Sequence, residues 1–216
     1  MARAWGASSC IVLLAITVAG CNFLGRAGEG AMTTESRQVA AFSNVEAGGG
    51  INVAITIGTT ASVEVRAQPN ILPIIATDVE GGTLKIHGTE AYNTSEPVLV
   101  IIVTPALTRI DLSGGSQGTA DGVTGDQLAV GLSGGAGLTA TGSVSVLTLN
   151  VSGGARADLG GLAAETVAVN ASGGANARVS ASNAVSGSAS GGSHVTVIGG
   201  ATVLVNSSGG ASVSSE

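Results

Sequence analysis

The chain has 216 residues, of which 35 are glycine, and its 14 acidic against 8 basic residues give a formal net charge of −6. Hydrophobic residues make up 44% of the chain, which is enough to bury a core and excludes a disordered acidic tail. The acidic balance argues against nucleic acid as a partner, and two cysteines with two histidines leave little material for a metal site or a disulfide framework.

The first segment predicts an export signal. Arg3 supplies a positive charge before the apolar run 11–18, which is shorter than the roughly 20 residues that a membrane span needs. Two small residues precede Cys21, and the stretch 18–21 resembles the bacterial lipobox, where a signal peptidase cuts before a diacylated cysteine. We therefore expect residues 1–20 to be a lipoprotein signal peptide and Cys21 to be lipidated. The alternative is an ordinary secretory signal with an incidental cysteine.

Residues 21–36 show no hydrophobic periodicity and predict a flexible tether between the membrane and a single domain that spans residues 37–216. In the first part of this domain, alternation of apolar and polar residues over 51–57 and 62–66 predicts two strands. The prolines that follow allow no more than a helical turn over 71–76.

Two further segments of the first half predict strands of different kinds. The stretch 79–86 contains Gly81 and Gly82 between alternating residues, which is typical of a hairpin with a glycine turn. The continuous apolar run 98–103 predicts a strand that is buried on both faces and is too short to cross a membrane.

The second half is a repeat marked by the tripeptide Ser-Gly-Gly. Apolar residues stand one, three and five positions before most of these serines and five and seven positions after them, and this period of two indicates strands. Glycine adopts positive φ without steric cost, so each repeat is expected to hold two short strands that meet at a Gly-Gly corner. The tripeptide occurs six times, at spacings of 20, 19, 20, 18 and 18 residues, with its serines at Ser113, Ser133, Ser152, Ser172, Ser190 and Ser208.

The near-constant spacing favours an all-β parallel β-helix, a solenoid with coils of about 18–20 residues, over a meander or barrel of antiparallel hairpins. Mostly small polar residues stand two positions before each serine, where stacked coils would let them hydrogen-bond along a ladder. These ladder positions are Asp111, Gly131, Asn150, Asn170, Ser188 and Asn206.

An ordered series of segments carries a family resemblance. Phe42–Val45 and Gly50–Val53, followed by 82–86, 100–114 and the small-Gly repeats, resemble the bacterial family named "putative auto-transporter adhesin, head GIN domain". The match covers roughly 39–214. The resemblance implies an exported all-β protein of stacked coils, and it implies no established activity.

The sequence predicts no catalytic, cofactor or metal site. His87 and His194 lie in different halves, and the six repeated serines fit a corner role in which the hydroxyl bonds its own turn. Asp111, Asp121 and Asp126 are the acids that could meet around Ca²⁺, but the glycine-rich nonapeptide of calcium-binding β-rolls is absent. No aromatic residue in the repeats could stack on a sugar, so we expect the protein not to be an enzyme.

The sequence thus predicts an exported lipoprotein of the bacterial cell envelope, at the outer membrane or the cell surface. Its expected partners are the membrane, through the lipid anchor, and a glycan or protein ligand bound by an adhesion module. Two alternatives stay open: a purely structural envelope lipoprotein and a carbohydrate-active β-helix enzyme.

Overall fold

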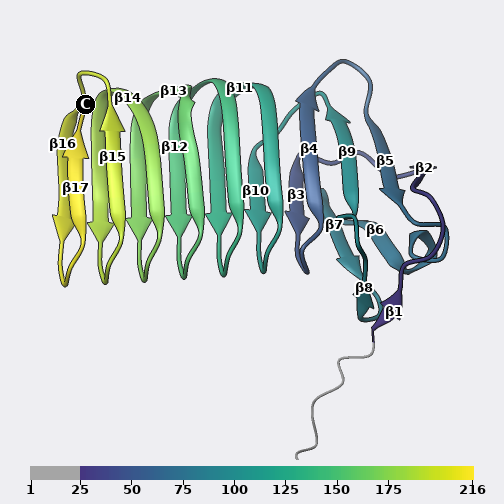
Figure 1. Cartoon of the computed structure of the whole chain (residues 1–216). Coiled ribbons are helices and arrows are strands. Elements are labelled where there is room, and N and C mark those ends of the chain that lie inside the picture. The colour runs from purple at the N-terminus through teal and green to yellow at the C-terminus, as the bar shows by residue number, and fades with distance from the viewer. Residues whose placement is uncertain (1–24) are drawn as a thin grey trace, which may run out of the picture.

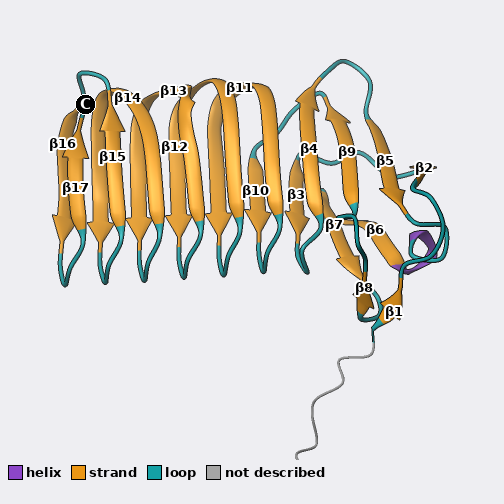
Figure 2. Cartoon of the chain, viewed as in Figure 1, coloured by secondary structure: helices purple, strands orange, loops and turns teal. Residues whose placement is uncertain are grey.

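The computed structural model describes residues 25–216, so the predicted signal peptide and Cys21 lie outside the described residues. The described chain is β-structure interrupted by one short 3₁₀ helix, η1 (Leu72–Ile74) (Figures 1 and 2). The strands are, in chain order, β1 (Arg26–Ala27), β2 (Thr33–Arg37), β3 (Asn44–Ala47), β4 (Asn52–Ile57), β5 (Ser62–Ala67), β6 (Ile75–Glu80), β7 (Thr83–Gly88), β8 (Tyr92–Asn93), β9 (Leu99–Thr104), β10 (Arg109–Leu112), β11 (Gln117–Leu132), β12 (Gly137–Val151), β13 (Arg156–Ala171), β14 (Asn176–Ala189), β15 (His194–Ile198), β16 (Thr202–Ser207) and β17 (Ser212–Ser215).

The second half is a parallel solenoid, as the repeat predicts. Strands β10 to β14 pair in chain order, β15 and β16 both pair with β14, and β17 pairs with β15, all in parallel. The register places Leu112 opposite Leu132, Leu132 opposite Val151 and Val151 opposite Ala171, so each residue before a corner serine stacks on its counterpart. The parallel β-helix is confirmed, and the hairpin alternative is wrong.

Each long strand covers two sides of the solenoid, because it bends where the ladder register shifts. The shifts lie between Ala120 and Val123 in β11 and between Thr139 and Thr141 in β12. The halves of β11–β14 after the bend, together with β7, β3, β10 and β16, form one side, which we call the ladder face. The halves before the bend form the other side with β9, β4, β15 and β17.

The core runs along the inside of the coils and consists of aliphatic side chains. The inward positions predicted from the alternation, such as Ile110, Leu128, Leu149 and Leu159, are fully buried. Alanines fill many of the other inward positions, which suits a thin interior where two sheets approach closely. In the last coil the corresponding residues are only partly buried, because no further coil covers them.

The N-terminal part closes its end of the solenoid with antiparallel strands. Strand β5 pairs with β9 and with β2, and β6 pairs with β7 through the predicted Gly81-Gly82 hairpin. The tether predicted over 21–36 is wrong for its described part, since Arg26–Ala27 pairs with β8 and Thr33–Arg37 pairs with β5 over five residues. Edge pairing uses backbone groups and needs no apolar periodicity, so the sequence pattern misses it.

Strand β9 departs from the prediction that both of its faces are buried. Val100 and Ile102 point into the core, whereas Ile101 is 37% exposed. The other two outward side chains of β9, Leu99 and Val103, are half-buried. The helical turn expected over 71–76 is confirmed by η1. Among residues 25–216, no helix has the length and apolar character needed to cross a membrane.

Candidate functional site

The corners of the solenoid set the geometry of the candidate site. In each Ser-Gly-Gly corner the first glycine has positive φ, for example +71° at Gly153 and +72° at Gly173, and the second glycine does not. The turn is closed by the backbone, with the N–H of Ser116 donating to the carbonyl of Ser113 at 3.3 Å. Positive φ at the first central residue alone is the sign pattern of a type II′ turn. The Gly-Gly corners predicted from the repeat are therefore confirmed.

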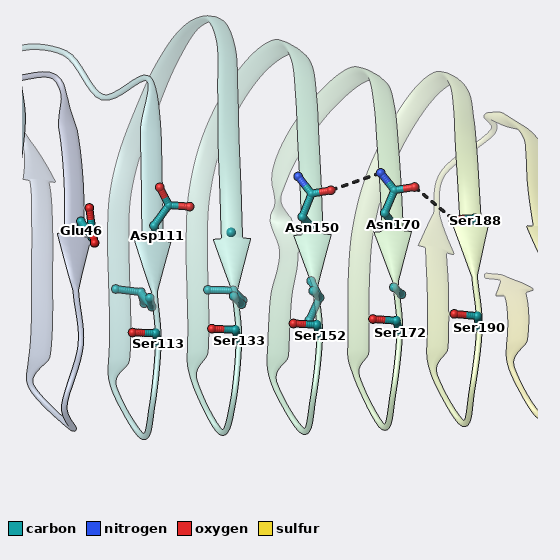
Figure 3. Close-up of a pocket in the computed structure, with 15 residues that line it drawn as sticks. Glu46, Asp111, Ser113, Ser133, Asn150, Ser152, Asn170, Ser172, Ser188 and Ser190 are labelled. Carbon is teal, nitrogen blue, oxygen red and sulfur yellow. Dashed lines mark hydrogen bonds between the residues drawn. The ribbon is translucent and has the colours of Figure 1, made fainter.

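A column of main-chain hydrogen bonds joins each corner to the preceding one. The N–H of Gly154 donates to the carbonyl of Gly134 at 2.8 Å, and the N–H of Gly174 donates to the carbonyl of Gly153 at 2.7 Å. These bonds align successive corners, so the corner serines stand in a straight row along the solenoid (Figure 3).

The hydroxyls of this row point outward from the turns. The interpretation that each hydroxyl bonds its own turn is wrong, because no hydrogen bond joins a corner hydroxyl to its turn. At four of the six corners the serine carbonyl closes the turn instead. Within residues 25–216 the six corner hydroxyls make no hydrogen bond, and five of them are drawn in Figure 3 with their oxygens on the same side. Neighbouring hydroxyls are therefore spaced by about 4.8 Å, the distance between paired strands.

A second row of polar side chains runs beside the serines on the ladder face. Asn170 donates from Nδ2 to Oδ1 of Asn150 at 3.2 Å and accepts from the hydroxyl of Ser188 at 3.0 Å (Figure 3). This confirms the predicted ladder for three of its positions. The side-chain bonds fix the amide orientations and leave the outer edges of the amides open to a ligand.

Gly131 interrupts the ladder and gives room to its neighbour. A Cβ built on Gly131 would lie 2.1 Å from Oδ1 of Asp111, so the aspartate side chain leans over the glycine. Asp111 is also paired with Arg109, whose Nη2 donates to Oδ1 at 3.2 Å. This hydrogen bond, together with the charge of Asp111, raises the pKa of Arg109 above its ordinary value. Asp111 lies opposite Glu46 of β3 in the register, so the row of neutral side chains becomes acidic at this end.

The two rows border a shallow groove on the ladder face, which we call the polar groove. It has a volume of about 460 Å³ and crosses the strands from β3 to β14. Its lining combines hydroxyl, amide and carboxylate groups with aliphatic surface from residues such as Leu132 and Val151. Glu46 and Asp111 lie at one end and Ser188 and Ser190 at the other (Figure 3). Sequence reasoning found the ladder and the serines but missed Glu46 and Arg109, which lie on neighbouring strands and carry no repeat signal.

The other candidate residues stay apart. His87 and His194 are exposed, and Nδ1 of His194 lies 3.2 Å from the carbonyl of Gly192. Asp121 accepts from the hydroxyl of Thr141 at 3.2 Å, while Asp126 lines a separate hollow at the bends. In the described part of the chain, no three His, Cys, Asp or Glu side chains gather where they could hold a metal ion.

Comparisons with known proteins agree with this architecture. The model of the family "Putative auto-transporter adhesin, head GIN domain" matches residues 41–201. The structure of a putative adhesin from Bacteroides fragilis superposes with a TM-score of 0.70 at 17% identity, covering 89% of this chain and all of that one. A putative adhesin from Parabacteroides merdae (TM-score 0.56) and a putative lipid binding protein from Parabacteroides distasonis (TM-score 0.55) each share 14% identity over 88% of this chain and 98% of theirs. A search of the curated proteins gave no match.

Proposed function

The chain belongs to the head GIN domain family of putative auto-transporter adhesins, and from this premise we propose that it is an adhesive binding module of the bacterial cell envelope. We further propose that a lipid on Cys21 anchors it and that the polar groove holds an extended, uncharged, hydroxyl-rich chain, that is, a glycan. The observation that carries the proposal is the row of unbonded corner hydroxyls beside a hydrogen-bonded amide ladder.

The chemistry of the groove suits a glycan better than a charged ligand. A hydroxyl both donates and accepts, so a row of serines complements a ligand that repeats the same two functions along its length. From Gly131 to Ser190 the lining contains no charged group. The Parabacteroides distasonis protein described as lipid binding shares 14% identity with this chain, a likeness that supports a common fold and not a common ligand.

The acidic end of the groove supports binding rather than hydrolysis. Glycosidases pair a nucleophilic or basic carboxylate with a carboxylic acid whose surroundings keep it protonated. Here Asp111 is held in an ion pair with the guanidinium of Arg109, and Glu46 is exposed to water. This arrangement favours a non-enzymatic module over the carbohydrate-active alternative.

Substitution of the groove serines tests the binding proposal. Ser152→Leu combined with Ser172→Leu fills the centre of the groove with side chains, and we expect at least a tenfold loss of binding on a glycan array. The control is Ser145→Leu, which places the same side chain in the hollow at the bends. Unchanged binding by the double variant, with an unchanged melting temperature, overturns the groove assignment. If the native protein binds neither glycans nor intact cells, the structural alternative replaces the proposal.

Substitution of Cys21 tests the anchor. Cys21→Ser removes the thiol that would accept the diacylglyceryl group, so we expect an unlipidated chain that is lost from washed membranes. Each buried CH₂ contributes about 0.8 kcal/mol to membrane binding, so loss of the acyl chains removes stable attachment. Cys10→Ser is the matched control and should stay lipidated and membrane-bound. Metabolic labelling with palmitate that is equal in the two variants contradicts the anchor.

A further inference from the structure

The two ends of the solenoid differ in whether further strands pair with their outer edges. At the N-terminal end, β9 is covered by β5 and β5 by β2, while β7 is covered by β6 (Figure 1). At the other end, β16 pairs only with β14 and β17 only with β15. Within the described residues, the outer edges of β16 and β17 therefore present backbone N–H and C=O groups that no neighbouring strand satisfies.

At the uncovered end β17 is short, at four residues, whereas β16 carries none of the features that usually protect an edge strand. Natural edges are blunted with lysine, proline, bulges or very short strands, and β16 is a regular six-residue strand of sequence TVLVNS. Leu204 in its centre is 67% exposed, and Val203 and Val205 are only partly buried. The edge thus combines unpaired backbone with exposed aliphatic side chains.

The distribution of charge makes this end suitable for contact with a second copy of the chain. The chain carries a net charge of −6, yet no Asp, Glu, Lys or Arg occurs between Val179 and Ser215. The charged groups that flank this stretch, Arg178 and Glu216, form an ion pair at 3.1 Å. Two copies of an acidic chain repel each other over most of their surface, and this end is where the repulsion is smallest.

We propose that the end formed by β16 and β17 is a docking surface for a second copy of this chain. A two-fold axis across the solenoid axis brings the same edge of both copies together with the facing strands antiparallel, so the unpaired donors and acceptors satisfy each other. The contact closes after two copies because the other end is covered by antiparallel strands. This inference is independent of the proposed ligand of the polar groove.

The size of the end predicts a weak, concentration-dependent dimer. Six residues at about 3.4 Å each and two sheets about 10 Å apart give a face of roughly 20 Å by 20 Å with its side chains. Two such faces bury about 800 Å², below the roughly 1,200–2,000 Å² of stable complexes. The assay must therefore trap the dimer covalently as well as measure it at equilibrium.

Cysteine trapping tests the contact on the full-length chain in mild detergent. In a background of Cys10→Ser and Cys21→Ser, Leu204→Cys is treated with a short bismaleimide, and we expect cross-linked dimers. Val146→Cys is the matched control, because Val146 is 43% exposed in the middle of the solenoid. We expect at least ten times more dimer from Leu204→Cys. Equal or no cross-linking at the two positions overturns the proposal.

Sedimentation equilibrium of the otherwise native full-length chain gives the second readout. Leu204→Lys places like charges across the two-fold contact at an exposed position where folding is not at risk, and we expect at least a tenfold weaker dimer. Val146→Lys should leave the dimer unchanged. A chain that stays monomeric at every concentration, or that forms a ladder of larger head-to-tail assemblies, overturns the two-fold contact.

Discussion

Gly153→Ala tests the description of the corners most directly, because the adjacent Gly154 offers a matched control. Gly153 has φ +71°, a region in which an L-residue costs roughly 1–2 kcal/mol. A Cβ on Gly153 would also lie 3.0 Å from the carbonyl oxygen and 3.1 Å from the amide nitrogen of Gly134 in the preceding coil. The neighbouring corner must give way by a few tenths of an ångström to admit it.

That movement reaches the column of corner hydrogen bonds on both sides. The Gly154 N–H to Gly134 carbonyl bond and the Gly174 N–H to Gly153 carbonyl bond both pass through this corner, and each contributes about 0.5–1.5 kcal/mol. Removing a glycine stiffens the unfolded chain and returns about 0.4–1 kcal/mol. We expect a net loss on the order of 2 kcal/mol in the free energy of unfolding, or roughly 4–8 °C in melting temperature for a chain of this length.

The matched control, Gly154→Ala, should not lower the free energy of unfolding. Gly154 has no positive φ, and its Cβ would lie 3.6 Å from the nearest atom, an ordinary contact. Gly154→Ala should therefore be neutral or stabilising by up to about 1 kcal/mol. Urea and thermal melts followed by circular dichroism measure both variants. Equal losses for the two variants, or no loss for Gly153→Ala, would refute the assignment of the turn. Gly209→Ala in the last corner should fall between them, since its φ is similar but no later coil rests on it.

Three further substitutions have defined outcomes. Tyr92 has a buried hydroxyl without a partner among residues 25–216, so Tyr92→Phe should not lower the melting temperature. Burial raises the pKa of Tyr92 above 10.0, so the folded state keeps the phenolic proton to higher pH than the unfolded state does. The free energy of unfolding therefore falls as the pH rises through the folded pKa. Tyr92→Phe should show a smaller fall than the native protein in urea melts above about pH 10. Asn170→Ala removes two exposed ladder bonds and should cost about 1 kcal/mol in urea melts, whereas an unchanged midpoint would mean that the ladder does not stabilise the coils. Gly131→Ala meets no positive φ but displaces Asp111, so the Nε–H resonance of Arg109 should shift in NMR spectra while stability changes by less than about 1 kcal/mol.

The regular half of the fold follows from the sequence because two periodic signals agree there. The alternation of apolar residues gives strands, and Ser-Gly-Gly at near-constant spacing gives stacked corners. The inward positions, the Gly-Gly corners and the Asn150–Asn170 bond were all predicted this way. The bends on the far side were not, because Asp121-Gly122 in one coil and Gly160-Gly161 in another share no common motif.

The irregular half and the groove were harder to predict for a different reason. Strand β2 is ordered by pairing with β5, which lies far away in the sequence, and no local pattern near Thr33 predicts this pairing. The polar groove depends on the direction of side chains. At four of the six corners the serine carbonyl, rather than the hydroxyl, closes the turn, and Asp111 turns into the space above Gly131. Such choices among local hydrogen bonds are close in energy and are decided by stacking, which a single sequence does not display.

The main-chain bonds between corners make the coil an interchangeable unit. Gly154 to Gly134 and Gly174 to Gly153 are bonds between backbones, so they form in any coil that keeps its corner glycines, whatever its other side chains. Duplication or loss of one whole repeat in the gene would preserve every corner and lengthen or shorten the solenoid by one strand spacing, about 4.8 Å. The length of the solenoid can therefore evolve in discrete steps, separately from the surface chemistry of each coil.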